Sequence, residues 1–227
     1  MTKLKPGIQV TQKRGLYYLV DSKGRMKRSR PWLGDSFAFL YDFAMRKSVF
    51  PRKFGAEIGK HYDILTQALA DVHGQHMLEL ATGSGSAVRF LTRDNAYTGT
   101  DISPNLLRRA AKRFSEAGFR EPTLYVVSAE DIPFANAAFD LVLCILSLNF
   151  FSDVDQVFQE VRRVLAPGGM LICSVPVPER QPLQSRIRGT LYSEADWGDI
   201  CAAHGMAFQP IPGENGALLY FKALKQA

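Results

Sequence analysis

The chain has 227 residues, 46% of them hydrophobic, three cysteines and a formal net charge of +6. This length supports one substantial hydrophobic core, and we expect a single main domain with an N-terminal appendage. No apolar run approaches the roughly 18 residues that a membrane span requires, which argues against an integral membrane protein.

The positive charge is concentrated in the N-terminal quarter of the chain. Residues 1–60 hold 14 Lys and Arg against 4 Asp and Glu, whereas residues 61–227 hold 14 against 18. Such a region could attract nucleic acid, an anionic membrane surface or an acidic substrate, or it could be a solvated basic face. The start of the chain lacks the apolar segment of a signal peptide, so we expect a soluble, cytoplasmic protein with peripheral membrane contact left open.

The three cysteines, Cys144, Cys173 and Cys201, are far apart in apolar surroundings. They lack the paired spacing of metal ligands, so we expect neither a zinc site nor a disulfide framework. Plain buried thiols are the expectation, and no metal is expected.

The N-terminal region is expected to contain a small β-hairpin over residues 7–28, followed by helices. The basic cluster at 25–30 lacks interleaved aromatic residues, so its support for RNA binding is modest. A helix is predicted to start at Asp35-Ser36, and another covers about 55–71. The apolar positions of the first helix recur at helical spacing: Phe37, Leu40, Tyr41 and Ala44.

The stretch from Met77 to Phe90 predicts a buried strand, a tight glycine turn at Gly83 and Gly85, and the start of a helix. A short strand ending in Asp101 follows, where a doubly wound sheet places the carboxylate that binds ribose hydroxyls. The fit to an NAD site is imperfect, because Val88 stands where a third glycine or alanine is expected. Glu79, inside the first strand, would repel a pyrophosphate but suit a positively charged ligand.

The rest of the chain alternates between apolar strands and amphipathic helices, which predicts a parallel sheet with helices on both faces. We expect helices from the Ser103 cap to Gly118, from the Asp153 cap to a stop at Pro167–Gly169, and over 193–205. Strands are expected over 124–128, 139–146, 170–175, 207–210 and 217–223, the last two joined as a hairpin.

The segment Leu78-Glu-Leu-Ala-Thr-Gly-Ser-Gly85 resembles the first motif of the class I S-adenosylmethionine-dependent methyltransferases. Its Ala-Thr-Gly variant is similar to the form in the ubiquinone/menaquinone C-methyltransferase branch. The resemblance covers roughly residues 75–225 and implies S-adenosyl-L-methionine as the cofactor. It implies an α/β fold with a doubly wound, mostly parallel seven-stranded sheet. Residues 1–72 would form the hairpin and a helical lid, and residues 73–227 the cofactor-binding domain.

The resemblance also assigns cofactor contacts to the loops after the strands. Glu79 would orient the ammonium group indirectly, and Asp101 would hold the ribose hydroxyls. The other assigned positions are Gly83, Ser84 and Gly85 around the methionine part, Ile102 on the adenine, Ser128 and Ala129 at its edge, and Ile145 at the methionine end.

Two positions depart from the family pattern. Ala81 replaces a common first glycine, which is tolerable if the backbone there keeps a negative φ. Ser128 stands where an Asp often binds the adenine amino group, and Glu130, two residues on, could substitute for it.

Methyl transfer from a sulfonium is an in-line displacement, so a dedicated catalytic residue is optional. In the resembled branch the segment before the first strand folds over the cofactor and often carries a Tyr-Asp pair, which Tyr41-Asp42 resembles. If the acceptor must lose a proton, the candidate bases are Tyr41, Asp42 and His61. The alternative is that these residues simply pack or hydrogen-bond within the lid.

The leading interpretation is a methyltransferase for a small, apolar or quinone-like molecule, because the expected lid is rich in aromatic residues. RNA is the alternative substrate, although neither an Asn/Asp-Pro-Pro-Tyr tetrapeptide nor a Pro-Cys motif follows the strand at 139–146. An NAD-linked oxidoreductase and a non-catalytic cofactor-binding module are the remaining alternatives. The oligomeric state is left open. The lid aromatics are Phe37, Phe39, Tyr41, Phe43, Phe50 and Phe54.

Overall fold

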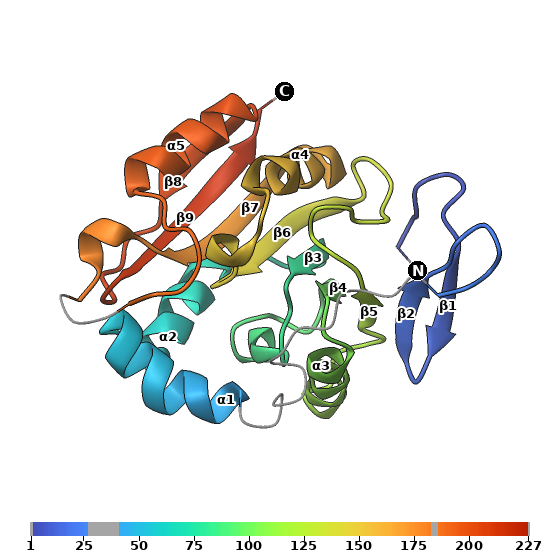
Figure 1. The fold of residues 1–227 in the computed structure, drawn as a ribbon, viewed down its shortest axis with the longest axis horizontal. Helices are drawn as coiled ribbons and strands as arrows, with labels where there is room; N and C mark the ends of the chain where they lie inside the picture. Colours follow the sequence, from blue (N-terminus) through green and yellow to red (C-terminus); the bar gives the residue numbers. More distant parts are fainter. Residues whose placement is uncertain (1, 27–40, 183–185, 227) are drawn as a thin grey trace.

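A nine-stranded sheet forms the centre of the protein in the computed structural model, which describes residues 2–26, 41–182 and 186–226 (Figure 1). The strand order is β1-β2-β5-β4-β3-β6-β7-β9-β8. The strands are β1 (Val10–Lys13), β2 (Leu16–Leu19), β3 (His76–Leu80), β4 (Ala96–Asp101), β5 (Thr123–Val126), β6 (Phe139–Ile145), β7 (Leu165–Pro176), β8 (Met206–Pro210) and β9 (Leu218–Lys225).

The sheet is mostly parallel, as the alternation of strands and helices predicts. Neighbouring strands from β2 through β7 pair in parallel, whereas β1, β9 and β8 are antiparallel to their neighbours. The doubly wound fold and the closing antiparallel pair are therefore confirmed. The expected count of seven strands is wrong, because the N-terminal hairpin adds β1 and β2 to the edge beside β5. Tyr17 pairs with Tyr125 there, and the two rings stack with centroids 5.0 Å apart.

Helices cover both faces of the sheet (Figure 1). One hydrophobic cluster contains side chains from α2 (Ile58–Ala68) and α3 (Pro104–Glu116), and the other contains side chains from α4 (Val154–Val164) and α5 (Glu194–Ala203). The central strand β6 contributes Leu141 and Leu143 to the first cluster and Val142 and Cys144 to the second. A strand that is buried on both faces in this way is typical of the middle of a parallel sheet.

Local capping fixes where the helices begin. The Ser103 hydroxyl accepts a hydrogen bond from the Leu106 amide at 3.1 Å, and the Asp153 carboxylate accepts one from Gln156 at 2.8 Å. Ser193 and Asp196 form a reciprocal capping box at the start of α5. These caps satisfy amides that have no partner inside the helix, which confirms the three helix starts expected from the sequence.

The segment predicted to be a lid, and called the lid from here on, consists of α1 (Tyr41–Ala44), which continues directly as the π-helix η2 (Met45–Phe54), and then α2. The expected start at Asp35-Ser36, with Phe37, Phe39 and Leu40, lies outside the described residues. Phe50 and Phe54 are buried, and α2 falls within the predicted stretch 55–71. The boundary between the lid and the cofactor-binding domain at residue 72 remains a prediction.

Two local expectations are corrected by the structure. The segment after Gly85 forms only the 3₁₀ turn η3 (Ser86–Arg89), because Thr92 and Asn95 bond the backbone carbonyl of Val72 and hold the chain in a non-helical path. Strand β7 starts at Leu165 and includes the expected stop at Pro167–Gly169. Leu165 pairs with Phe139, and the register of the β6–β7 ladder shifts between Phe139 and Leu141.

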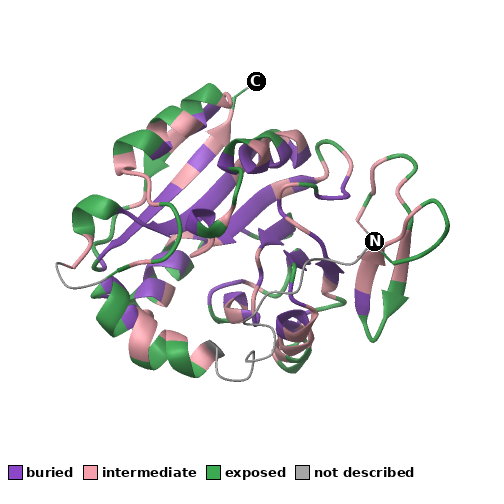
Figure 2. Cartoon of the chain, viewed as in Figure 1, coloured by how far each residue is buried: buried purple, intermediate pink, exposed green. Residues whose placement is uncertain are grey.

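Burial follows the layers: Figure 2 shows the central strands buried and the outer faces of the helices exposed. Cys144, Cys173 and Cys201 are buried free thiols, as expected. The described helices include none that is both long and apolar enough to cross a bilayer. Two further 3₁₀ turns, η4 (Leu148–Phe150) and η5 (Pro178–Arg180), complete the connections.

Candidate active site

The glycine loop follows the carboxyl end of β3 and is hydrogen-bonded to the carboxyl end of β4. The Thr82 amide donates to the Thr100 carbonyl at 2.8 Å, and the Gly83 amide donates to Asp101 Oδ2 at 2.8 Å. Asp101 Oδ1 accepts the Ser103 amide at 2.8 Å, so the same carboxylate also supports the start of α3. These bonds hold the loop beside Asp101, the acid that ends β4. The sequence motif contains both the loop and this acid.

Backbone conformation in the loop differs from one expectation. Ala81 has a φ of 51°, in the left-handed region, so the condition of a negative φ at this position is not met. A residue with a Cβ in that region is strained by about 1–2 kcal/mol. Gly85 has a φ of 82°, and a Cβ there would lie 2.8 Å from the Ala110 Cα. Its role is therefore to let the loop pack closely on α3.

Glu79 is a buried carboxyl directly below the loop, with 3% of its surface exposed. The Tyr97 hydroxyl donates a hydrogen bond to Glu79 Oε2. Burial raises the pKa of Glu79 to about 8, and the negative charge of Asp101 adds to this, while the Tyr97 bond opposes it. The group is therefore largely neutral near pH 7, and a cation placed beside it would favour its charged form.

A cavity of about 360 Å³ lies between the lid and the glycine loop. It brings together Asp42 and His61 from the lid with Glu79 and Ile145 from the strands. Its full lining is Asp42, Met45, Arg46, Phe50, Ile58, Gly59, His61, Tyr62, Glu79, Ala81, Thr82, Gly83, Ser84, Ser86, Arg89, Arg113, Ile145 and Leu146.

Asp42 connects the lid to the glycine loop. It accepts a hydrogen bond from the Ser84 hydroxyl at 2.6 Å and forms ion pairs with Arg113 and, at 3.0 Å, with Arg109. Burial acts to raise the pKa of this carboxyl, but the bonds from Arg113, Ser84 and Arg109 outweigh it and lower the pKa. An ionised carboxylate held in this way is a weak proton acceptor, and it fastens the lid across the loop.

His61 lies on the lid side of the cavity and is 2% exposed. Its Nδ1 lies 3.0 Å from the Tyr220 hydroxyl, and its ring centroid lies 5.1 Å from that of Phe50. Burial lowers the pKa of His61 to about 4, so the imidazole is neutral near pH 7. Tyr62 continues the aromatic wall, with the Arg89 guanidinium 5.5 Å from its ring centroid.

The expected adenine contacts lie outside this cavity. Ile102 is 39% exposed and Ala129 is buried. Glu130 accepts hydrogen bonds from the Ser152 hydroxyl at 2.6 Å and the Asp153 amide at 3.2 Å, and Ser128 lies 3.4 Å from its Oε2. The bond from Ser152 is the main cause that lowers the pKa of Glu130. Glu130 thus supports the start of α4.

Several residues that shape the site have no motif in the sequence. Arg113 donates to Asp42 and to the Ser84 carbonyl at 3.1 Å, and Tyr97 binds Glu79. The one available signal is that Arg109 and Arg113 lie four residues apart on α3, away from its buried face. For Tyr41 the structure gives a place in α1, and its side chain is outside the description.

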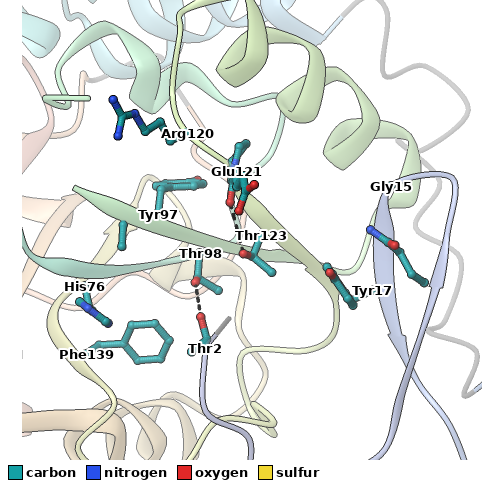
Figure 3. Close-up of a pocket in the computed structure, with 13 residues that line it drawn as sticks. Thr2, Gly15, Tyr17, His76, Tyr97, Thr98, Arg120, Glu121, Thr123 and Phe139 are labelled. Carbon is teal, nitrogen blue, oxygen red and sulfur yellow. Dashed lines mark hydrogen bonds between the residues drawn. The ribbon is translucent and has the colours of Figure 1, made fainter. Parts of the chain in front are cut away.

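A second cavity, of about 550 Å³, lies at the amino ends of the parallel strands, and Figure 3 shows the residues that line it. It is lined by the first residues of four parallel strands, His76, Ala96, Thr123 and Phe139, and by the hairpin residue Tyr17. In doubly wound sheets, ligands bind at the carboxyl ends of the strands. The smaller cavity, at the glycine loop, is therefore the candidate active site.

The smaller cavity suits a ligand with charges of both signs. Glu79 offers a carboxyl group to a cation, and Arg113, Arg89 and Arg46 offer guanidinium groups to an anion. A Cβ added at Gly83 would meet only the Ala81 carbonyl oxygen, at 3.9 Å, so the backbone there is open to close approach. An amino-acid-like group with an ammonium, a sulfonium and a carboxylate fits this set of side chains.

Comparison with known proteins agrees with this chemistry. The methyltransferase domain family matches residues 78–173. The demethylmenaquinone methyltransferase of Thermotoga maritima is 31% identical over 173 residues, 75% of this chain and 70% of that protein. The ubiquinone/menaquinone biosynthesis C-methyltransferase of Ralstonia pickettii is 35% identical over 115 residues, 49% of this chain and 47% of that protein. The chain spans less than half of the length of several curated relatives, between 39% and 47%.

Solved structures show the same fold. A methyltransferase from Aquifex aeolicus, described as dependent on S-adenosylmethionine, superposes with a TM-score of 0.62 at 16% identity, covering 84% of this chain and 96% of that one. Without the N-terminal hairpin the sheet has seven strands, in the order β5-β4-β3-β6-β7-β9-β8, and seven is the number expected from the sequence resemblance. The chain belongs to the class I S-adenosylmethionine-dependent methyltransferases, with relatives among the quinone-biosynthesis methyltransferases.

Proposed function

We propose that this methyltransferase acts on a small, planar and largely apolar acceptor of the quinone or quinol class. The observation that carries the proposal is the cavity itself. Its lid side is aromatic, with Phe50, His61 and Tyr62, and its other side is the glycine loop with Glu79. Aromatic walls favour a flat apolar molecule, since rings pack well in stacked or edge-to-face geometry. Two relatives named for menaquinone or ubiquinone methylation support the same class.

The cofactor would bind along the carboxyl ends of β3 and β4. We assign Glu79 to the ammonium group and Asp101 to the ribose hydroxyls, with Arg113 as a partner for the carboxylate. When bound, the cofactor supplies an electrophilic methyl group on a sulfonium. The remaining proposed contacts are Ala81, Gly83, Ser84, Gly85, Ile102, Ser128, Ala129, Glu130 and Ile145, of which Ala81, Gly83, Ser84 and Ile145 line the cavity.

The protein's own part in the reaction would be positioning and exclusion of water. An in-line displacement requires the acceptor atom to lie opposite the leaving sulfur, and a closed aromatic cavity can hold it there. Asp42 is engaged by two arginines, and the pKa of His61 is lowered to about 4, so both are weak bases at neutral pH. We therefore propose catalysis that does not depend on a strong general base.

Contact with an anionic membrane surface is a further part of the proposal. Phe43 is 65% exposed on α1, and Arg46, Lys47 and Arg52 follow it as exposed cations on η2. An exposed aromatic beside several cations is a pattern that favours the interface of anionic lipids. We propose a cytoplasmic location, consistent with three buried thiols that form no disulfide.

The test is transfer of a labelled methyl group from S-adenosylmethionine to defined acceptors by the purified chain. The acceptors are 1,4-naphthohydroquinone, 1,4-benzohydroquinone and total RNA, measured separately. Label in a quinol product supports the proposal, and Asp101→Asn should abolish it. Asp131→Asn, whose side chain is 76% exposed, is the matched control and should be active. Label in RNA alone would overturn the acceptor class and make the basic N-terminal region the substrate-binding element.

A further inference from the structure

A chain of hydrogen bonds runs from the backbone of the lid to the candidate active site. Asn215 Oδ1 accepts the Glu57 amide at 2.8 Å, and its Nδ2 donates to the Glu57 carbonyl at 3.0 Å. Because a backbone amide can only donate and a carbonyl can only accept, these two bonds fix the orientation of the Asn215 side chain. Its Nδ2 also donates to the Tyr220 hydroxyl at 3.1 Å.

The Tyr220 hydroxyl links Asn215 to His61 and so determines which ring nitrogen of His61 carries the proton. Tyr220 is 1% exposed, and burial raises its pKa to about 12, so it keeps its proton. The hydroxyl accepts from Asn215, and within the described chain the acceptor next to it is His61 Nδ1, at 3.0 Å. Nδ1 is then the acceptor nitrogen, and a neutral imidazole with an unprotonated Nδ1 carries its proton on Nε2.

The Nε2 atom of His61 has a small accessible surface, although the residue as a whole is only 2% exposed. Within the described part of the chain this atom forms no hydrogen bond. The buried polar atoms without a partner do not include it, so part of its surface is accessible. Since His61 lines the cavity, the accessible surface of this atom belongs to the cavity. The neighbouring rings of Phe50 and Tyr62, with centroids 5.1 and 5.6 Å from the imidazole, offer it no strong acceptor.

We propose that His61 recognises the methyl acceptor, its Nε2–H donating a hydrogen bond to a substrate oxygen such as a quinone carbonyl or quinol oxygen. Tyr220 and Asn215 are positioning residues that maintain this tautomer. The inference rests on the proposed function for the class of acceptor. It reverses the expectation that His61 is a base, because the nitrogen open to the cavity already carries the proton. A donor at this position also selects, among flat apolar molecules, those that carry an oxygen atom on the ring.

The tautomer is measured directly by long-range ¹H–¹⁵N correlation spectra of the ¹⁵N-labelled protein at pH 7. In the wild type, His61 should show an unprotonated Nδ1 and a protonated Nε2. In Tyr220→Phe, which removes the hydroxyl, this preference should be lost or reduced while the rest of the spectrum is retained. A proton on Nδ1 in the wild type would overturn the inference without any reference to activity.

Recognition of oxygen is measured with two probes of matched shape, 2,3-dimethyl-1,4-naphthoquinone and 2,3-dimethylnaphthalene. Affinities are measured by titration with S-adenosylhomocysteine present. The wild type should bind the quinone about tenfold more tightly, the effect of one hydrogen bond. His61→Gln keeps an amide donor but has no basic nitrogen, and should keep most of this preference. His61→Phe should lose it.

The outcomes separate this inference from the proposed function. Equal binding of the two probes by the wild type, including no binding of either, overturns the inference, and so does an unchanged preference in His61→Phe. Neither measurement uses methyl transfer. Failure to methylate quinols therefore counts against the proposed function, while the tautomer and the probe preference decide the role of His61. Thermal melts of the three variants establish that each one is folded.

Discussion

The buried carboxyl of Glu79 should make the stability of the protein fall as the pH rises through neutrality. In the folded protein its pKa is about 8, compared with an ordinary value of 4.5. Between these values the folded state keeps a proton that the unfolded chain has lost. Raising the pH therefore favours the unfolded chain across this window. Replacement by glutamine, which is neutral at every pH and of similar shape, should remove the effect.

The size of the effect is best measured between pH 6.5 and 8. Each full pH unit in this window corresponds to about 1.4 kcal/mol, and because the folded carboxyl is half ionised at pH 8, the interval gives a fall of about 1.6 kcal/mol in the free energy of unfolding. His61 has the opposite sign, because its pKa is lowered from 6.5 to about 4. Its contribution increases up to about pH 7.5 and is constant above, so between pH 6.5 and 8 it offsets the fall by about 0.4 kcal/mol. The lowered pKa values of Asp42 and Glu160 confine their effects to still lower pH.

The assay is urea denaturation at pH 6.5 and 8 for the wild type, Glu79→Gln and the exposed control Glu116→Gln. The wild type and the control should both lose about 1.2 kcal/mol between the two pH values, the net of the Glu79 and His61 contributions, and Glu79→Gln should lose nothing. An equal loss in all three proteins would refute the reasoning. It would mean that Glu79 is ionised in the folded protein, stabilised by the Tyr97 hydroxyl despite its burial.

Three further changes test the glycine loop. Ala81→Gly should raise the free energy of unfolding, measured in urea, by about 0.5–1 kcal/mol, because the relief of left-handed strain exceeds the entropy that glycine loses on folding. A loss of stability would contradict the φ of 51°. Gly85→Ala should lower it by about 2–4 kcal/mol, since the new Cβ meets Ala110 and the φ is positive, and an unchanged melt would argue against this packing. Asp101→Asn should weaken S-adenosylmethionine binding at least tenfold in calorimetry, whereas wild-type affinity would remove Asp101 from the proposed contacts.

Local patterns predicted the fold well. The caps at Ser103, Asp153 and Ser193 use side chains that bond amides only three residues away, so the sequence contains the whole interaction. The apolar run of β6 likewise predicts a strand buried on both faces. The place of the hairpin was not predictable, because the pairing of Tyr17 with Tyr125 joins residues far apart in the chain.

The sequence predicted only part of the candidate site, because only some of its contacts join residues that are close in the chain. The glycine loop, Glu79 and Asp101 are close in sequence and formed a recognisable motif. The partners that decide the chemistry of Asp42 and His61 are distant: Arg113 lies 71 residues from Asp42, and Tyr220 lies 159 residues from His61. The left-handed conformation of Ala81 also had no signal, because alanine ordinarily avoids it.

The hairpin beside β5 also bears on how the protein behaves at high concentration. Without it, β5 would end the sheet and present the unpaired backbone of Leu124, Tyr125 and Val126, a short apolar edge suited to pairing with another chain. The hairpin covers that edge and makes β1 the outer strand instead. That strand has only four residues, and its last two, Gln12 and Lys13, are exposed. A short outer strand that ends in a lysine disfavours edge-to-edge association, so β1 and β2 protect the sheet from aggregation.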